Sequence, residues 1–279
     1  MFHKIELAKL SQSEAFKYAQ SLPWFKDRQE IVFKPGLNIF LGRNGSGKST
    51  VLKMLGDGLC ATQGGISAVT TDVISSQIDM MSSIGARLRN PAVQVPEMTD
   101  RIGLEIVHDG QPVVYCDPRR TVGISGGGLD DDFADAGIIE AMTAHRRSHG
   151  ELALYRVNPA LAMLNGKAKF PDQIQRLVQR DQVNDRWQMA LDLLEARLQA
   201  RRGKGQPTIL LDEPESNYSL VWQSRLWGIL ARREVADRFQ VIVASHSAFA
   251  LGISHANYFE MTPGIREEAE EALRARFKS

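Results

Sequence analysis

One stretch, Gly42-Arg43-Asn44-Gly45-Ser46-Gly47-Lys48-Ser49, decides the fold of this chain. It fits the pattern GxxxxGK[ST] at every position. Such a loop needs small residues because its backbone N–H groups wrap around a phosphate group. The apolar segment Leu37–Leu41 precedes the loop, and an apolar pattern of helical spacing follows it over Thr50–Leu59. Strand, glycine-rich loop and helix in this order predict the opening of a parallel α/β sheet.

The residue types in this loop predict which groups of a nucleoside triphosphate they contact. Lys48 is expected to reach the β- and γ-phosphates, and the Ser49 hydroxyl is expected to ligate Mg²⁺. Thr50 is placed to contact the α-phosphate, and the following helix adds the positive end of its dipole. The expected nucleotide-binding residues are Arg43, Asn44, Gly45, Ser46, Gly47, Lys48, Ser49 and Thr50.

A second apolar strand, Thr208–Leu211, ends in the carboxylates Asp212 and Glu213. The first is suited to hold Mg²⁺ through water, and the second to polarise the water that attacks the γ-phosphate. Taken alone, such a segment also fits an acidic loop after a strand. The phosphate loop upstream in the same chain favours the catalytic interpretation.

A third apolar strand, Phe239–Ala244, is followed by Ser245, His246 and Ser247. A histidine at the end of a strand is often only a partly exposed polar residue. Here it follows Glu213 by 246 − 213 = 33 residues, enough for one crossover helix over Ser216–Arg233. We therefore expect the His246 imidazole to donate a hydrogen bond to the γ-phosphate and to sense its presence.

The middle of the chain carries weaker patterns. The segments Ile102–Val107 and Pro112–Cys116 flank a turn sequence and predict a β-hairpin. Apolar residues recur at helical spacing within Gln173–Arg202, and a charged helix is expected over Arg266–Lys278. We expect a single domain over 1–279, with the nucleotide-binding core in 1–60 and 205–260, a hairpin and helical insertion in 61–204, and the C-terminal helix in 265–279.

Composition excludes several classes of protein. The chain has 279 residues with 43% hydrophobic and 24% charged side chains, which is ordinary globular usage. A net charge of +1 gives no overall attraction to nucleic acid or anionic membranes, although a local basic face stays possible. No apolar run is long enough to span a bilayer, and the start lacks a signal-peptide pattern. The two cysteines, Cys60 and Cys116, fit a reducing compartment, so a cytoplasmic protein is expected.

The motifs GRNGSGKST, LLDEPE and a strand ending in SHS together resemble those of the ABC-type ATPase superfamily. DEPESNYS and ASHSAFAL look most like stand-alone, non-transporter members of the chromosome-maintenance (SMC-like), DNA-repair and phage-defence branch. The resemblance covers residues 31–60 and 205–255. It implies an α/β P-loop NTPase fold: a mostly parallel sheet with antiparallel N-terminal strands and a helical insertion. It also implies ATP and Mg²⁺ as cofactors.

The resemblance also implies a signature turn that caps the γ-phosphate bound by a second subunit. Ser148 and Gly150, in Ser148-His149-Gly150-Glu151, are the favoured residues and would act in trans. Ser125 in GISGGG and the region around Asn184 stay open as alternatives. The favoured choice places the signature 212 − 148 = 64 residues before Asp212, which requires an insertion absent from the usual family pattern.

Several further residues of the family pattern stay open. The glutamine that joins the Mg²⁺ site is Gln77, Gln94 or Gln111, and Trp24 or Phe25 is a candidate for stacking on adenine. Each of these two aromatic residues equally fits a place in the core.

The resemblance implies an ATPase that dimerises head to tail on ATP and drives or gates a separate effector protein or a nucleic acid. DNA repair and anti-phage defence are the processes that the branch suggests. One alternative is the ATPase subunit of a membrane transporter, but Tyr218-Ser219 departs from the Leu-Asp pair that transporters carry there. A nucleotide-switched scaffold that does not hydrolyse ATP is disfavoured by the presence of Glu213 and His246.

Overall fold

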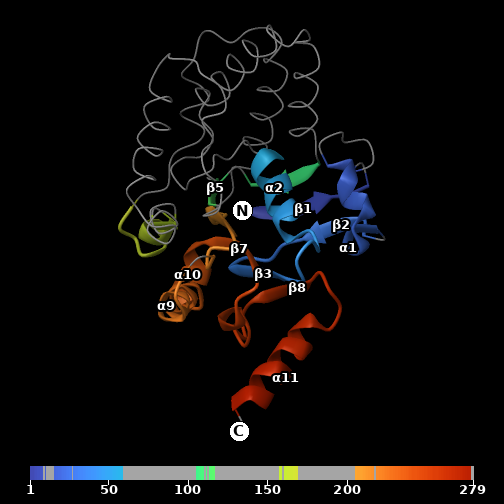
Figure 1. The fold of residues 1–279 in the computed structure, drawn as a ribbon. Helices are drawn as coiled ribbons and strands as arrows, with labels where there is room; N and C mark the ends of the chain where they lie inside the picture. The colour runs from blue at the N-terminus through green and yellow to red at the C-terminus, as the bar shows by residue number, and fades with distance from the viewer. Residues whose placement is uncertain are drawn as a thin grey trace, which may run out of the picture.

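The computed structural model (Figure 1) shows a mixed α/β fold. Within the described residues, the strands form two sheets. No helix in these parts of the chain has the length and apolar character needed to cross a bilayer. The structure describes residues 1–8, 10, 16–26, 28–58, 105–109, 111, 113–116, 157–158, 160–168, 205–216 and 218–277.

The larger sheet is parallel throughout and has the strand order β5-β6-β7-β3-β8. The residues of β3, β5, β6 and β7 are all buried, as expected for parallel strands covered on both faces. This mostly parallel arrangement, expected from the apolar runs, fits a P-loop NTPase fold. The strands are β3 (Leu37–Leu41), β5 (Val113–Cys116), β6 (Thr208–Asp212), β7 (Gln240–Ser245) and β8 (Asn257–Glu260).

The smaller sheet is antiparallel and has the order β2-β1-β4. Its strands are β1 (Phe2–Glu6), β2 (Glu30–Val32) and β4 (Ile106–His108). Its two N-terminal strands, β1 and β2, pair with each other in antiparallel orientation.

The expected β-hairpin is wrong, because β4 pairs with β1 whereas β5 pairs with β6 in the other sheet. Every residue of β5 is apolar and buried, which suits a parallel strand covered on both faces, not one arm of a hairpin.

Alternate residues of each central strand face opposite layers. Phe40, Leu210 and Ile242 join a core with helix α2 (Lys48–Gly58) and the antiparallel sheet. Their neighbours in the same strands join a second core with helix α9 (Leu220–Leu230). The parallel sheet is thus covered on both faces, which is the layered arrangement of an α/β domain.

Helices and short 3-10 turns connect the strands. The crossover between β6 and β7 consists of α9 and a second helix, α10, where one helix was expected. Helix α2 begins at Lys48, two residues before the expected start, and α11 follows β8 as expected for a C-terminal helix. Figure 1 shows α11 extending away from the sheet towards the C-terminus. The remaining elements are α1 (Pro23–Lys26), α10 (Arg233–Arg238), α11 (Ile265–Phe277) and the 3-10 turns η2 (Lys17–Ser21) and η3 (Ala248–Ala250).

A single buried side chain, Gln240 at the start of β7, joins the two sheets. Its Oε1 accepts hydrogen bonds from the Phe2 N–H at 2.8 Å and the Thr208 hydroxyl at 3.0 Å. Its Nε2 donates to the carbonyl oxygens of Phe2 at 2.8 Å and Lys34 at 3.0 Å. The N–H and the carbonyl of Phe2, the first residue of β1, therefore both hydrogen-bond to the Gln240 amide.

We predict that Gln240→Ala lowers the free energy of unfolding by about 3 kcal/mol. The buried N–H and carbonyl groups of Phe2 and the buried Thr208 hydroxyl would lose the Gln240 side chain as a partner, and each unsatisfied group costs about 1–3 kcal/mol. Urea denaturation followed by circular dichroism measures the change. Gln29→Ala, at an exposed position, is the matched control and should unfold like the wild type. Equal unfolding midpoints for the two variants would contradict the role given to Gln240.

Candidate active site

The carboxyl ends of three neighbouring parallel strands meet at one edge of the larger sheet. β7 lies between β6 and β3, and the register places Ala244 beside Asp212 and Ser245 beside Leu41. The loop after β3, the acidic pair at the end of β6 and His246 after β7 therefore emerge at the same level. In an open α/β sheet this edge is where ligands bind.

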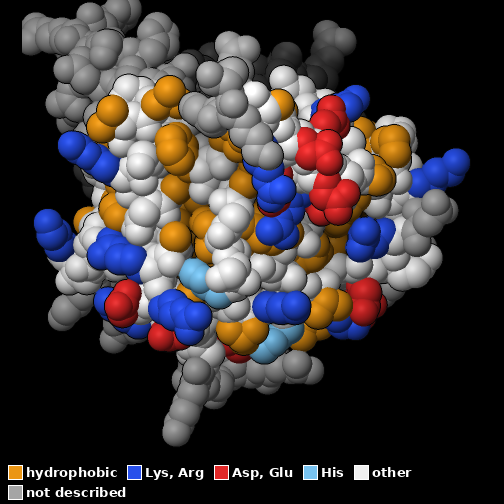
Figure 2. Space-filling model, turned by 90° about the horizontal axis from the view of Figure 1, so that it is seen from below, with side chains coloured by type: hydrophobic (Ala, Val, Ile, Leu, Met, Phe, Trp, Pro, Cys, Tyr) orange, Lys and Arg blue, Asp and Glu red, His pale blue; other side chains and the backbone are white. Residues whose placement is uncertain are grey.

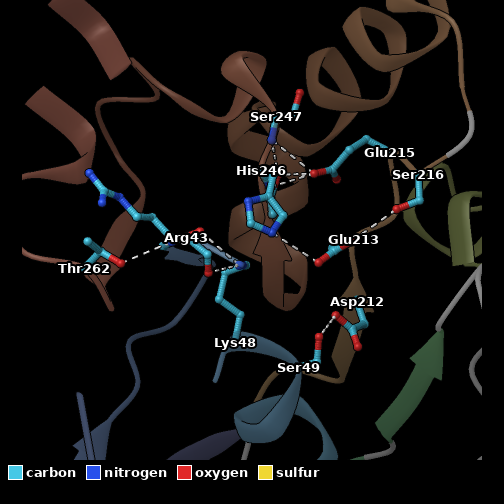
Figure 3. Close-up of polar contacts among 12 residues, drawn as sticks. Arg43, Lys48, Ser49, Asp212, Glu213, Glu215, Ser216, His246, Ser247 and Thr262 are labelled. Atoms are coloured by element: carbon cyan, nitrogen blue, oxygen red, sulfur yellow. Dashed lines mark hydrogen bonds and ion pairs between the residues drawn. The ribbon is translucent and has the colours of Figure 1, made fainter. Parts of the chain in front are cut away.

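The glycine-rich loop has the backbone geometry that its sequence predicts. Gly47 has φ +102°, and a Cβ atom there would lie 2.6 Å from Phe25 Cε2, so only glycine fits. Lys48 is buried, and its ammonium group donates to the carbonyl oxygens of Gly42 at 2.9 Å and Arg43 at 3.2 Å. The lysine side chain therefore folds back onto the backbone of the first two residues of the loop (Figure 3).

The Arg43 side chain faces the C-terminal helix instead of the loop. Its Nη2 lies 3.2 Å from Glu268 Oε2 on α11, and its backbone N–H donates to Thr262 Oγ1 at 3.1 Å. Ser46 Oγ is directed at Gly42, where an added Cβ would come within 2.5 Å of it. Of the expected nucleotide-binding residues, these two do not line the pocket described below.

Ser49 and Asp212 bring two oxygen atoms together beneath the loop. The Ser49 hydroxyl donates to Asp212 Oδ1 at 2.8 Å, and the Tyr115 hydroxyl donates to Asp212 Oδ2 at 3.5 Å. Hydroxyl and carboxylate oxygens are the hard ligands that Mg²⁺ prefers, and Mg²⁺ usually takes few protein ligands beside phosphate oxygens and water. The residues present therefore fit a magnesium ion held together with a bound nucleotide.

Gln111 lies at the wrong end of the sheet to join this magnesium site. It precedes β5, which runs parallel to β6, so it lies near the start of these strands while Asp212 lies at their end. The two other candidate glutamines, Gln77 and Gln94, lie outside the described residues.

Glu213 and His246 directly follow the neighbouring strands β6 and β7, and their side chains face each other. His246 Nε2 lies 3.3 Å from Glu213 Oε1, and the Ser216 hydroxyl donates to Glu213 Oε2 at 3.4 Å. Glu213 has φ +47°, a left-handed conformation that is costly for a residue with a Cβ and is often found at functional sites. Its backbone N–H donates to the Ala244 carbonyl at 2.8 Å, which holds this conformation.

A third carboxylate, Glu215, lies behind this pair and was not singled out from the sequence. Its Oε1 accepts hydrogen bonds from Ser245, His246 and Ser247. Burial raises the pKa of Glu215, these hydrogen bonds oppose the rise, and the nearby charge of Glu213 adds to it. The signal available in the sequence was a third acidic residue separated from the acidic pair by one proline.

The loop, the acidic pair and the histidine surround one pocket of about 520 Å³. Tyr18 and Leu22 complete its wall, and the Tyr18 hydroxyl lies 3.2 Å from Thr50 Oγ1. The Tyr18 side chain is 49% exposed, whereas Phe25 is buried in the core. The lining residues are Tyr18, Leu22, Asn44, Gly45, Gly47, Lys48, Ser49, Thr50, Glu213 and His246.

The two aromatic residues considered from the sequence do not line this pocket, because both pack inside the fold. The Trp24 ring contacts the rings of Phe25 and Phe40, and the Arg28 guanidinium lies over it. Tyr18 carried no recognisable motif, so only the folded chain identifies it as part of the wall. All three candidate signature segments, around Ser148 and Gly150, Ser125, and Asn184, lie outside the described residues.

Comparison with known proteins reaches only the first part of this site. Residues 20–75 match the model of a family described as an AAA domain, and the matched segment contains β2, β3, the glycine-rich loop and α2. No curated protein sequence matches the chain. The match supports a P-loop ATPase and, with it, binding of a nucleotide.

Proposed function

We propose that this protein hydrolyses ATP with Mg²⁺ at the edge of the parallel sheet. The observation that carries this proposal is the convergence of Ser49, Asp212, Glu213 and His246 on the pocket formed by the glycine-rich loop. Binding alone would require the loop and α2. A partly exposed carboxylate and an imidazole opposite the loop add the groups that hydrolysis requires.

Each residue has a distinct task in this proposal. The loop N–H groups and Lys48 bind the β- and γ-phosphates, and Ser49 and Asp212 hold Mg²⁺, which neutralises phosphate charge when bound. Glu213 accepts a proton from the attacking water. His246 donates a hydrogen bond to the γ-phosphate and holds its orientation.

Tyr18 extends this assignment to the nucleobase. Its half-exposed ring lines the pocket beside Thr50. Thr50 is the residue expected to contact the α-phosphate, which is the phosphate that carries the nucleoside. Aromatic rings bind bases by stacking, which contributes about 1–3 kcal/mol per base. We propose that Tyr18 stacks on adenine.

The resemblance to SMC-like ATPases supports a head-to-tail dimer formed on ATP. In such a dimer, Ser148 and Gly150 of a second copy would close the pocket over the γ-phosphate. We propose that this opening and closing drives a separate effector, in DNA repair or anti-phage defence.

A transporter subunit is not favoured, because Tyr218-Ser219 departs from the transporter pattern.

Nucleic acid is a second possible partner for the dimer. On the face seen in Figure 2, the described Lys and Arg side chains are scattered among Asp and Glu and do not form one basic patch. A separate protein effector is the partner that we favour, as the resemblance to stand-alone ATPases implies.

Lys48→Ala and Glu213→Gln are predicted to fail at different steps. Loss of a charged ligand of the phosphates should weaken ATP binding by about 10–100-fold, from about 1.5–3 kcal/mol for a hydrogen bond to a charged group. Glu213→Gln keeps the shape but accepts no proton, so ATP should bind normally while kcat falls about 10²–10⁴-fold. Binding titrations and phosphate-release assays separate the two effects.

Lys53→Ala and Glu234→Gln are the matched controls, since neither residue lines the pocket. Both controls should bind and hydrolyse ATP like the wild type. An equal loss of ATP affinity in Lys48→Ala and Glu213→Gln would show that the two roles are assigned wrongly.

Tyr18→Ala is predicted to weaken ADP and ATP binding to a similar extent, by about tenfold, from the loss of base stacking. Tyr18→Phe keeps the ring and loses only the hydroxyl near Thr50, so its affinity should stay close to that of the wild type. Titration with ADP measures both variants. Unchanged affinity in Tyr18→Ala would exclude stacking by this residue.

Dimerisation is predicted to depend on ATP. Glu213→Gln with ATP and Mg²⁺ should dimerise more tightly than any nucleotide-free variant, because ATP persists between the subunits. Light scattering measures the mass. Ser148→Arg in the Glu213→Gln background should abolish this tightening, while Ser125→Arg should leave it intact; the reverse pattern would move the signature to Ser125. A dimer of the same strength without nucleotide would contradict the proposal.

A further inference from the structure

The backbone segment that carries His246 is held by one carboxylate from the turn that follows the neighbouring strand, β6. Glu215 Oε1 accepts hydrogen bonds from the Ser245 hydroxyl at 2.6 Å, the His246 N–H at 2.8 Å and the Ser247 N–H at 3.1 Å. Three consecutive residues thus converge on a single oxygen atom, and Figure 3 shows the contacts from two of them, His246 and Ser247.

Beyond the end of β7, this carboxylate takes the place of the acceptors that neighbouring strands provide within the sheet. β7 ends at Ser245, so the N–H groups of His246 and Ser247 lie beyond its ladder with β3 and β6. Both Glu215 and Ser247 are buried, and a buried N–H group without an acceptor is costly. The Glu215 carboxylate accepts from the His246 N–H, and it shares the Ser247 N–H with Ser245 Oγ, which lies at 2.9 Å. Because Glu215 also accepts from the Ser245 hydroxyl, it holds the chain directly after the strand.

The far side of the segment is anchored as well. The Ser247 hydroxyl donates to Gln223 Oε1 on α9 at 3.1 Å and accepts from the Phe249 N–H at 3.3 Å. The His246 side chain, by contrast, is 34% exposed and points at Glu213 and the pocket. Its backbone is fixed on both sides, and only its imidazole is presented to the site.

Glu215 lies two residues after Glu213, in the turn that follows β6. The same turn therefore carries both the carboxylate that faces the imidazole and the carboxylate that holds the backbone of His246. The two segments are thus joined twice: Glu213 Oε1 lies 3.3 Å from His246 Nε2, and Glu215 accepts from the His246 N–H.

We propose that Glu215 is a positioning residue for hydrolysis: its carboxylate places the His246 imidazole relative to Glu213 and the γ-phosphate. It acts through His246 and touches no part of the nucleotide. This inference rests on the proposed function, in which His246 takes part in ATP hydrolysis.

The test is a double-mutant cycle of Glu215→Ala and His246→Ala, read as kcat for ATP hydrolysis and as ADP affinity. His246→Ala should lower kcat about 10²–10⁴-fold. Glu215→Ala should lower kcat about 10²-fold, the typical effect of misplacing a catalytic group by about 1 Å. ADP lacks the γ-phosphate, so its affinity should change by less than about twofold in either variant.

The double variant should hydrolyse ATP within about twofold of the His246→Ala rate, because positioning has no effect once the imidazole is absent. Glu215→Gln keeps an oxygen that accepts the same three hydrogen bonds, so it should restore most of the activity lost in Glu215→Ala. Glu234→Ala removes an exposed carboxylate from α10 and is the matched control.

Two results would overturn the inference. Multiplicative losses in the double variant would show that Glu215 acts independently of His246. A fall in ADP affinity as large as the fall in kcat would show that Glu215 only maintains the fold of the pocket.

Amide hydrogen exchange over residues 246–247, measured by mass spectrometry, separates this inference from the proposed function. Glu215→Ala should exchange faster there than the wild type, and Glu215→Gln should not. Faster exchange in Glu215→Ala without ATPase activity in the wild type would refute the proposed function while retaining the role of Glu215 in holding this segment. Unchanged exchange in Glu215→Ala would refute that role, whatever the ATPase activity of the wild type.

Discussion

The parallel hydrogen bonding of β7 to β6 on one side and to β3 on the other sets the spacing of the polar groups at the carboxyl edge of the sheet. Neighbouring strands lie about 4.8 Å apart, so His246 emerges between the acidic pair and the glycine-rich loop. All six residues of β7 are buried, and its alternate side chains contribute to cores on both faces of the sheet. A shift of its register by one residue would exchange these faces, so packing fixes the position of His246 as well.

Glu213 and Glu215 are two residues apart in the sequence, but their carboxylates have different surroundings at the carboxyl edge of the sheet. Glu213 is partly exposed, has a left-handed backbone and faces an imidazole and the pocket. Glu215 is buried, its pKa is raised by that burial, and three donors converge on one of its oxygen atoms. The difference in environment suits one carboxylate to proton transfer and the other to holding the chain, although both are the same type of residue.

Local patterns in the sequence determined much of the fold. The strand before the glycine-rich loop, the helix after it and the apolar strands ending at Asp212 and Ser245 could all be predicted, because each depends on neighbouring residues. A phosphate-binding loop constrains its own sequence closely, since backbone groups must surround the ligand. Of the residues predicted from these motifs, Lys48, Asp212, Glu213 and His246 lie together around or beneath the pocket.

The sequence alone therefore determined the motif residues and the strands and helix next to them, whereas the tertiary structure decided which strands are neighbours and which distant side chains meet. The insertion of β7 between β3 and β6 and the separation of β4 from β5 into two sheets depend on long-range packing. For the same reason, Tyr18 joins the pocket from a segment without a motif, and Glu215 reaches the end of another strand. Arg43 turns towards α11 because an acidic side chain far along the chain lies within its reach.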